Sequence, residues 1–372
     1  YRALSTADIE FQTIELSDGE PVTVSHAEYG KILRTRRLQK DRRAAFETLY
    51  ELYDDKRNTY ASIYNGICQR DWAQAQARNF DDTAEAALDS NNVPVSVLET
   101  LIETASEGVE PFQRYHRLRA ERLELEDDYD LYDSSIPLIE FDETYPYDEL
   151  AETIVEAVAP LGDEYQSQVE RALENRWIDV YETKGKRSGA YSAGVYGVHP
   201  YMLLNYNETL DNVFTVIHEL GHTMHTLLAD EAQPFATSTY TIFVAEVAST
   251  LNEALLLDFL LDETDDPAER AVLLQHQIDA IAGTFYTQSL FAEFELEAHR
   301  RVEQGQPITA DVLSSLYYEL LETYYGDVAA LDELYSVTWA RIPHFFNSPY
   351  YVYQYATCYA SSAKIVQDIL SD

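Results

Sequence analysis

The pentapeptide His218-Glu219-Leu220-Gly221-His222 constrains this chain more than any other feature. It continues the apolar run 213–217, whose pattern predicts a helix. In a helix of 3.6 residues per turn, positions four apart lie about 40° from each other, so both imidazoles can bind one metal ion. Glu219 lies one position away, where a carboxylate can take a proton from a water on the metal. The motif predicts a metal centre, and the competing interpretation is a helix with two unrelated histidines.

A metal site of this kind needs a third protein ligand. One large class supplies a histidine ten positions after the first, with a glycine between. Leu228 and His225 occupy those two positions, which excludes this class. The other class takes a glutamate from a later helix. The stretch 241–257 predicts such a helix, apolar almost all round and therefore buried. Glu246 is its candidate ligand, because a buried carboxylate is costly unless a charge or a metal compensates it.

Three further carboxylates belong to this prediction. Asp230 and Glu231 are the rival third ligands, but they lie in a polar stretch at the end of the first helix, where we expect solvation. Glu253 lies seven residues after Glu246, two turns along the same face. It either supports a ligand histidine by a hydrogen bond or pairs with an arginine elsewhere, and the sequence leaves both open.

Four blocks of sequence, in this order, resemble the oligoendopeptidase F members of the thimet oligopeptidase family of zinc metallopeptidases. The blocks are 189–206, 218–225, 243–246 and 341–357. The resemblance implies one Zn²⁺ per chain, with His218, His222 and Glu246 as its ligands. It also implies that Glu219 is the general base.

The fourth block carries the groups that the resemblance assigns to the scissile carbonyl and its oxyanion. They are His344 and a tyrosine after it, for which Tyr353 fits best by offset. Tyr351 and Tyr355 are then substrate contacts, and the competing interpretation is a packed aromatic rim with wet hydroxyls. Thimet oligopeptidases have a glycine-rich loop after this histidine, whereas residues 345–349 of this chain include a proline, which predicts a stiffer loop.

The stretch 184–189 opens a short predicted β region just before the metal-binding helix, with 201–206 as its second strand, and Gly189 and Tyr191 lie near its start. Both residues are candidate substrate contacts, because an exposed strand edge binds an extended peptide through main-chain hydrogen bonds. The chemistry is consistent with this arrangement. Zinc held by two histidines and one glutamate leaves a position for water and lowers its pKa toward 7.

Charge is the strongest feature of the composition. The chain has 66 acidic and 26 basic residues, a formal net charge of −40, and only six lysines. Such self-repulsion is tolerable when salt screens it, which predicts the cytoplasm of a salt-accumulating halophile. The alternatives are an ordinary acidic protein, or one whose acidity attracts cationic peptides. The one basic run, 31–43, is expected to be a solvated face paired with acids, so no nucleic-acid partner is predicted.

The predicted fold is mainly α, an elongated helical metallopeptidase with a small antiparallel β-sheet beside the HExxH helix and a deep substrate channel. Residues 1–183 are expected to form channel helices and 184–372 the zinc catalytic core, within one continuous fold. Family members are longer at the N-terminus, so we expect a fragment. No apolar segment reaches 18 residues, so no membrane association is predicted, and two cysteines, Cys68 and Cys358, fit a reducing cytosol.

These features together predict a zinc endopeptidase that hydrolyses internal bonds of short unstructured oligopeptides. Its oligomeric state is not predicted. One rival is a peptide-binding protein without catalysis, which would have no need of an intact His218, Glu219, His222 and Glu246. The other rival is a metallo-carboxypeptidase, which would need a positive group for the substrate's terminal carboxylate.

Overall fold

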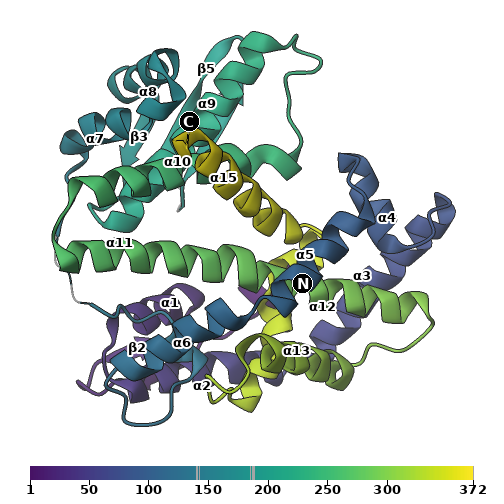
Figure 1. Cartoon of the computed structure of the whole chain (residues 1–372). Coiled ribbons are helices and arrows are strands. Elements are labelled where there is room, and N and C mark those ends of the chain that lie inside the picture. The colour runs from purple at the N-terminus through teal and green to yellow at the C-terminus, as the bar shows by residue number, and fades with distance from the viewer. Residues whose placement is uncertain (140, 142, 185, 187–188, 372) are drawn as a thin grey trace. The chain divides into compact units, whose positions relative to one another are not determined.

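The structure, a computed structural model, describes residues 1–139, 141, 143–184, 186 and 189–371. Helices dominate this part of the chain, as predicted, and two small sheets accompany them (Figure 1). The chain forms two compact units. The first comprises Tyr1–Leu138 and Ile281–Tyr353, and the second comprises Ile139–Ala280 and Gln354–Asp372. The boundaries of these units reflect how compactly each part of the chain is packed. The predicted boundary at residue 183 separates channel helices from a catalytic core, which is a division by function, and it stays a prediction.

The second unit contains the strands β3, β4 and β5 and the helices around them. Its elements are η4 Tyr147–Glu149, α7 Leu150–Ala157, η5 Ala159–Leu161, α8 Asp163–Glu174, β3 Ile178–Tyr181, β4 Tyr191–Val195, β5 Val198–Tyr206, α9 Leu210–Ala232, α10 Ile242–Glu263, α11 Pro267–Ala280 and, from its second residue, α15 Tyr353–Ser371.

The sheet of the second unit has the order β3-β5-β4. Strands β4 and β5 form an antiparallel hairpin, with Ala193 opposite Tyr201. Strand β3 is parallel to β5, with Ile178 opposite Met202, so the expectation of a purely antiparallel sheet was wrong. The reason lies in the path of the chain. After β3 the chain passes beyond the position of β5 and forms β4 at the far edge of the sheet. Strand β5 then turns back between them and runs in the same direction as β3.

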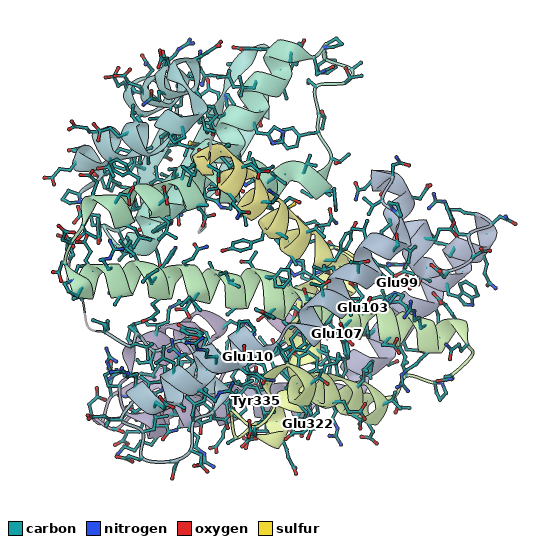
Figure 2. The ribbon with its side chains drawn as sticks, in the orientation of Figure 1. Glu99, Glu103, Glu107, Glu110, Glu322 and Tyr335 are labelled. Atoms are coloured by element: carbon teal, nitrogen blue, oxygen red, sulfur yellow. The ribbon has the colours of Figure 1, made fainter. Side chains whose placement is uncertain are left out.

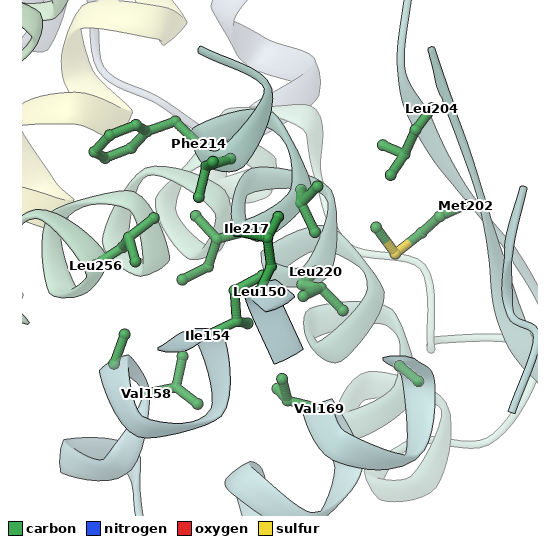
Figure 3. Close-up of a cluster of buried hydrophobic side chains, with 14 of the residues drawn as sticks. Leu150, Ile154, Val158, Val169, Met202, Leu204, Phe214, Ile217, Leu220 and Leu256 are labelled. Atoms are coloured by element: carbon green, nitrogen blue, oxygen red, sulfur yellow. The ribbon is translucent and has the colours of Figure 1, made fainter. Parts of the chain in front are cut away.

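The core of the second unit lies between this sheet and its helices. Alternate residues of β5, Met202 and Leu204, are buried and face helix α9. Helix α9 contributes Phe214, Ile217 and Leu220 to the same cluster, which Figure 3 shows between the strands and the helices α7 and α8. The apolar face of α9 therefore packs against both the sheet and the neighbouring helices. This packing fixes the rotation of α9 about its axis and so determines where its polar side chains point.

Helices α9 and α10 approach each other closely at Gly221. A Cβ atom at this position would lie 2.6 Å from the backbone oxygen of Ala248 and 2.6 Å from Cα of Ser249. Only glycine permits this approach, because the neighbouring atoms belong to the backbone of α10 and have little freedom to move. The glycine inside the HExxH motif therefore sets the distance between the two helices.

The first unit is almost wholly helical. Its elements are η1 Ala3–Ala7, β1 Thr13–Glu15, β2 Pro21–Thr23, α1 His26–Thr35, α2 Gln39–Asp54, α3 Arg57–Ala77, α4 Thr83–Leu88, η2 Asp89–Asn91, α5 Val95–Glu107, α6 Glu110–Arg122, η3 Leu131–Asp133, η6 Ile281–Tyr286, α12 Thr287–Glu303, α13 Ala310–Tyr325, η7 Glu333–Arg341 and α14 Pro343–Asn347. Strands β1 and β2 pair antiparallel.

The basic run 31–43 pairs with acids, as predicted, but not all of it is solvated. Arg36 contacts Asp18 and Glu20 at the surface. Arg42 has no exposed side-chain surface and binds the equally buried Asp133 at 2.6 Å, so this position was wrongly assigned to a solvated face. Its guanidinium also donates to backbone carbonyls, which compensates its burial. Among the described residues, no helix has both the length and the apolar character needed to cross a bilayer.

Candidate metal centre

Helices α9 and α10 bring His218, His222 and Glu246 together. One ligand atom from each lies within 4.8 Å of the others, and no other group of three or more such residues occurs in the part of the chain that the structure describes. Nε2 of His218 and Nε2 of His222 each lie 3.4 Å from Oε2 of Glu246. The rival ligands Asp230 and Glu231 are not part of the group.

The spacing of these atoms fits a tetrahedral metal ion. Two ligand atoms that are each about 2.1 Å from a tetrahedral zinc lie about 3.4 Å apart. The two distances of 3.4 Å to Glu246 Oε2 match this separation. Two imidazole nitrogens and one carboxylate oxygen are also the donor set of catalytic zinc sites, which keep one further position open.

Neighbouring side chains hold two of the three candidate ligands in place. Nδ1 of His218 donates to Oε1 of Glu253 at 2.5 Å, which directs Nε2 toward Glu246. Of the two interpretations of Glu253, the structure therefore favours support of a ligand histidine. The Ser249 hydroxyl donates to Oε2 of Glu246 at 2.8 Å.

The local electrostatics match these contacts. Burial acts to lower the pKa of His218, but the hydrogen bond and charge of Glu253 outweigh it and raise this pKa. Burial acts to raise the pKa of Glu246, but its hydrogen bond with His222 and the charges of both histidines hold the pKa at about 2. Glu246 is therefore an anionic donor between two imidazoles, which is the state a divalent cation requires.

Glu219 is buried beside this group, with 6% of its surface exposed. Burial raises the pKa of its carboxyl group, and the backbone N–H of Ser192 in β4 hydrogen-bonds to it. Its second oxygen, Oε2, has no hydrogen-bond partner among the described residues. A buried carboxylate oxygen left open beside two imidazoles fits the role of a base that receives a proton from water. The hydroxyls of Ser192 and Thr223, 2.8 Å apart, connect β4 to α9.

The β region also has the expected open edge. Strand β4 is the last strand of the sheet order, so one of its edges is unpaired within the described residues. Tyr191, its first residue, is 43% exposed. Gly189 has a positive φ of 86°, and its carbonyl accepts from Nδ2 of Asn205 at 2.7 Å.

The candidates of the fourth block fall into both units. His344 belongs to α14 of the first unit, and its ring stacks on that of Tyr351, with centroids 5.5 Å apart and planes at 14°. Burial lowers the pKa of His344. Tyr353 begins α15 and is 1% exposed, whereas Tyr351 is half-buried. Tyr355 is half-buried and belongs to the second unit.

Sequence reasoning missed three residues of this centre: Ser192, Gly221 and Ser249. The first and third act through hydrogen bonds between elements distant in sequence, which no local pattern reveals. Gly221 did carry a signal, because a glycine inside an apolar helix often marks a close approach of another backbone.

Comparison with known proteins places the chain in a family. Residues 32–372 match the profile of peptidase family M3. The chain belongs to this family. It is 38% identical to oligopeptidase PepF of Bacillus subtilis (strain 168), over 100% of this chain and 55% of that protein. It is 40% identical to the chromosomal oligoendopeptidase F of Lactococcus lactis subsp. cremoris, over 98% of this chain and 60% of that protein.

Solved structures of related proteins have the same fold as this chain. A putative peptidase from Chlamydophila abortus superposes with a TM-score of 0.91 at 36% identity, over 100% of this chain and 62% of that one. Oligoendopeptidase-F from Enterococcus faecium superposes with a TM-score of 0.79 at 33% identity, over 99% and 60%. The resemblance to oligoendopeptidase F is thereby confirmed. The chain spans 55% and 60% of the lengths of the two curated relatives.

Proposed function

We propose that this M3-family chain is a zinc-dependent endopeptidase that hydrolyses internal bonds of short, unstructured oligopeptides. The observation that supports it most is the grouping of His218, His222 and Glu246 beside a buried Glu219 with one open carboxylate oxygen. Its relatives are named as oligopeptidases and oligoendopeptidases, which supports the substrate class. A deep channel that excludes folded proteins is part of the proposal.

The metal is proposed to be a single Zn²⁺, held by His218, His222 and Glu246. When bound, it would supply a Lewis acid that polarises the scissile carbonyl and lowers the pKa of the attacking water toward 7. Ser249 and Glu253 would keep the two ligands that they contact in their binding orientation.

Glu219 would move the protons. Oε2 accepts one from the attacking water, and the carboxyl group then delivers it to the leaving amine. Its orientation comes from the backbone N–H of Ser192, which holds the carboxylate from the side of β4. A raised pKa suits both halves of this task, because the group must accept a proton and then release it.

The developing oxyanion would be stabilised by His344 and a neighbouring tyrosine. The sequence offset favoured Tyr353, but the geometry within the first unit favours Tyr351. Its ring stacks on His344 and is half-buried, whereas the ring of Tyr353 is almost fully enclosed. We therefore assign the oxyanion donor to Tyr351 and a packing role to Tyr353.

The open edge of β4 would hold the substrate as an added strand. Main-chain hydrogen bonds provide affinity that tolerates many peptide sequences, with Gly189 and Tyr191 at the entrance and Tyr355 as a further contact. The acidic composition further supports a place in the cytoplasm of a salt-accumulating halophile.

One assay tests the proposal as a whole. A peptide blocked at both ends, with an internal fluorophore and quencher, is incubated with the chain in dilute and molar KCl, and bound zinc is measured by mass spectrometry. We expect cleavage that stops on chelation and returns with Zn²⁺. A matched peptide with a free carboxyl end is assayed in parallel, and cleavage of that peptide alone would indicate a carboxypeptidase. Zinc and peptide binding without cleavage would indicate a binding protein.

A further inference from the structure

Tyr350 has an unusual backbone conformation at the junction between α14 and α15. Its φ is +57°, in the left-handed region. A bulky aromatic residue adopts this conformation rarely, and only where surrounding contacts outweigh the strain. The junction matters because Tyr351 lies within it and His344 lies in α14 just before it, and these two residues are the proposed carbonyl-binding pair.

Three separate contacts hold Tyr350 in place. Its ring lies 4.8 Å from the ring of His299. Its hydroxyl lies 2.7 Å from Oγ1 of Thr83, to which it donates because that threonine donates in turn to Glu303. Its backbone N–H hydrogen-bonds to the carboxylate of Glu295. Only 5% of the surface of Tyr350 is exposed. These contacts therefore anchor the turn between α14 and α15 to the interior of the first unit.

Helix α12 provides the other side of this anchor. Glu295 is 1% and His299 0% exposed. Nδ1 of His299 donates to the backbone oxygen of Glu295 at 2.8 Å, and Nε2 lies 3.3 Å from Oδ2 of Asp71. Burying such groups is costly, and the hydrogen bonds between them restrict the positions of the groups that they contact. Burial raises the pKa of Glu295 to about 7.

The same helix also holds the residue that follows His344. Phe294 packs on Phe345 of α14, with ring centroids 5.1 Å apart. Consecutive residues of α12, Phe294 and Glu295, therefore contact the segment before the turn and the turn itself. The part of the chain that carries His344 and Tyr351 is held at two points by one rigid helix.

We propose that Tyr350, anchored by Glu295 and His299, is a positioning residue that fixes the turn presenting His344 and Tyr351 as a stacked pair. This inference rests on the proposed function of that pair. Tyr350 itself takes no part in the reaction. Release of the anchor lets the turn relax from its left-handed conformation, and the pair then loses its geometry while the metal centre on α9 and α10 is unchanged.

The first test compares two substitutions of Glu295. Glu295→Gln keeps an oxygen that accepts from the Tyr350 N–H, whereas Glu295→Met has a similar size and no such acceptor. We expect the Gln variant to stay within about 3-fold of wild type and the Met variant to lose about 10²-fold in kcat, since small displacements of aligned groups have effects of this size. KM, zinc content and helical circular dichroism should change little. Equal loss in both variants, or in neither, overturns the proposal.

Substitution of Tyr350 provides a second test in case the Met variant does not fold. Tyr350→Gly removes the backbone strain together with the ring and hydroxyl contacts, and leaves only the N–H bond to Glu295, so the fold should persist while kcat falls as in the Met variant. Tyr350→Phe keeps the ring and the backbone contact and loses only the bond to Thr83, so kcat should fall less than 10-fold. A Gly variant with wild-type kcat would show that the anchor has no positioning role.

A spectroscopic measurement separates this inference from the proposed function. With ¹³C-labelled histidine rings, the His344 signal, assigned with His344→Asn, reports the Tyr351 ring stacked on it. Glu295→Met and Tyr350→Gly should shift this signal as Tyr351→Leu does, and Glu295→Gln should not. If the chain cleaves no peptide but the signal shifts in this way, the function fails and the positioning stands. If it cleaves and the signal does not move, the positioning is overturned.

Discussion

Glu219 provides the sharpest test at the scale of single residues, because its shape and its proton chemistry can be separated. Glu219→Gln keeps the size of the side chain and a hydrogen bond to Ser192, but an amide does not accept the proton. We expect zinc content to stay unchanged and kcat to fall by at least about 10²-fold. Turnover and metal content measured on one preparation check this, and near-normal turnover contradicts the assignment.

The third ligand is tested by metal content alone. Glu246→Ala removes the oxygen that lies 3.4 Å from both imidazole nitrogens, so zinc affinity should fall by orders of magnitude. Glu231→Ala is the matched control, since that residue is exposed on the last turn of α9 and outside the group. Competition with a chromophoric chelator measures both affinities. Equal zinc binding in the two variants would show that Glu246 is not a ligand.

Removing one hydroxyl group at a time distinguishes the roles of Tyr351 and Tyr353. Tyr351→Phe should lower kcat by about 10²–10³-fold with KM nearly constant, which is the effect of losing one oxyanion donor. Tyr353→Phe keeps a ring that is almost fully enclosed and should change kcat little. Steady-state kinetics on both variants decide the matter. The reverse result would restore the assignment that the sequence offset favoured.

What the sequence could predict at this scale follows from local geometry. The spacing of His218 and His222 and the apolar surroundings of Glu246 predicted a group that the structure brings together. Ser192 and Ser249 could not be predicted, because their roles depend on which strand and which helix turn face each carboxylate. Those contacts are set by tertiary packing, and serine is too common for its presence to indicate them.

At the scale of elements, the approach of α9 to α10 determines the geometry of the proposed metal centre. Gly221→Ala would place a Cβ atom 2.6 Å from backbone atoms of α10, so the helices must separate. We expect a loss of about 1–3 kcal/mol in unfolding free energy, and weaker zinc binding because Glu246 moves away from the histidines. Thermal unfolding and zinc titration measure both effects.

A glycine elsewhere gives the control for this prediction. Gly66 lies inside α3, is exposed, and a Cβ atom there would meet nothing within 4 Å. Gly66→Ala should therefore stabilise the chain by up to about 1 kcal/mol through helix propensity. If Gly221→Ala behaves in the same way, the close approach of the two helices is not a constraint.

The sheet shows where element prediction from sequence ends. The strand beginning near Tyr191 and the strand over 201–206 were predicted from their position before the metal-binding helix, and the structure has both as β4 and β5. The parallel pairing of β3 with β5 was missed. Strand order depends on how a connection crosses the sheet, and the residues of that connection carry no pattern that fixes its direction.

At the scale of the whole molecule, charge is the dominant property. On α5, Glu99, Glu103 and Glu107 follow one another at intervals of four, so like charges adjoin along one face (Figure 2). Glu110 begins α6 and extends the row. Of these, Glu99 has an ion pair, with Arg300 at 2.6 Å. With a net charge of −40, such rows are not neutralised by the 26 basic residues.

The melting temperature should therefore rise steeply between dilute buffer and molar KCl, as the screening length falls to about 3 Å. Calorimetry over a series of KCl concentrations measures this. Glu103→Gln with Glu107→Gln should make the salt dependence shallower, whereas an uncharged osmolyte at equal osmolality should not reproduce it. A melting temperature that does not change with salt would make the acidity incidental.

Strand β4 has a consequence for how such an enzyme can evolve. Strand β4 pairs with β5 along one edge, and the Ser192 N–H that holds Glu219, the proposed base, projects from its other edge, which is unpaired within the described residues. If β4 binds the peptide and Glu219 accepts the proton, as proposed, a mutation that shifts β4 to suit a different peptide also shifts the proton acceptor, so a gain in binding is penalised in the chemical step. New peptide preferences should therefore arise through side chains beyond this strand, and its backbone should drift more slowly than its sequence.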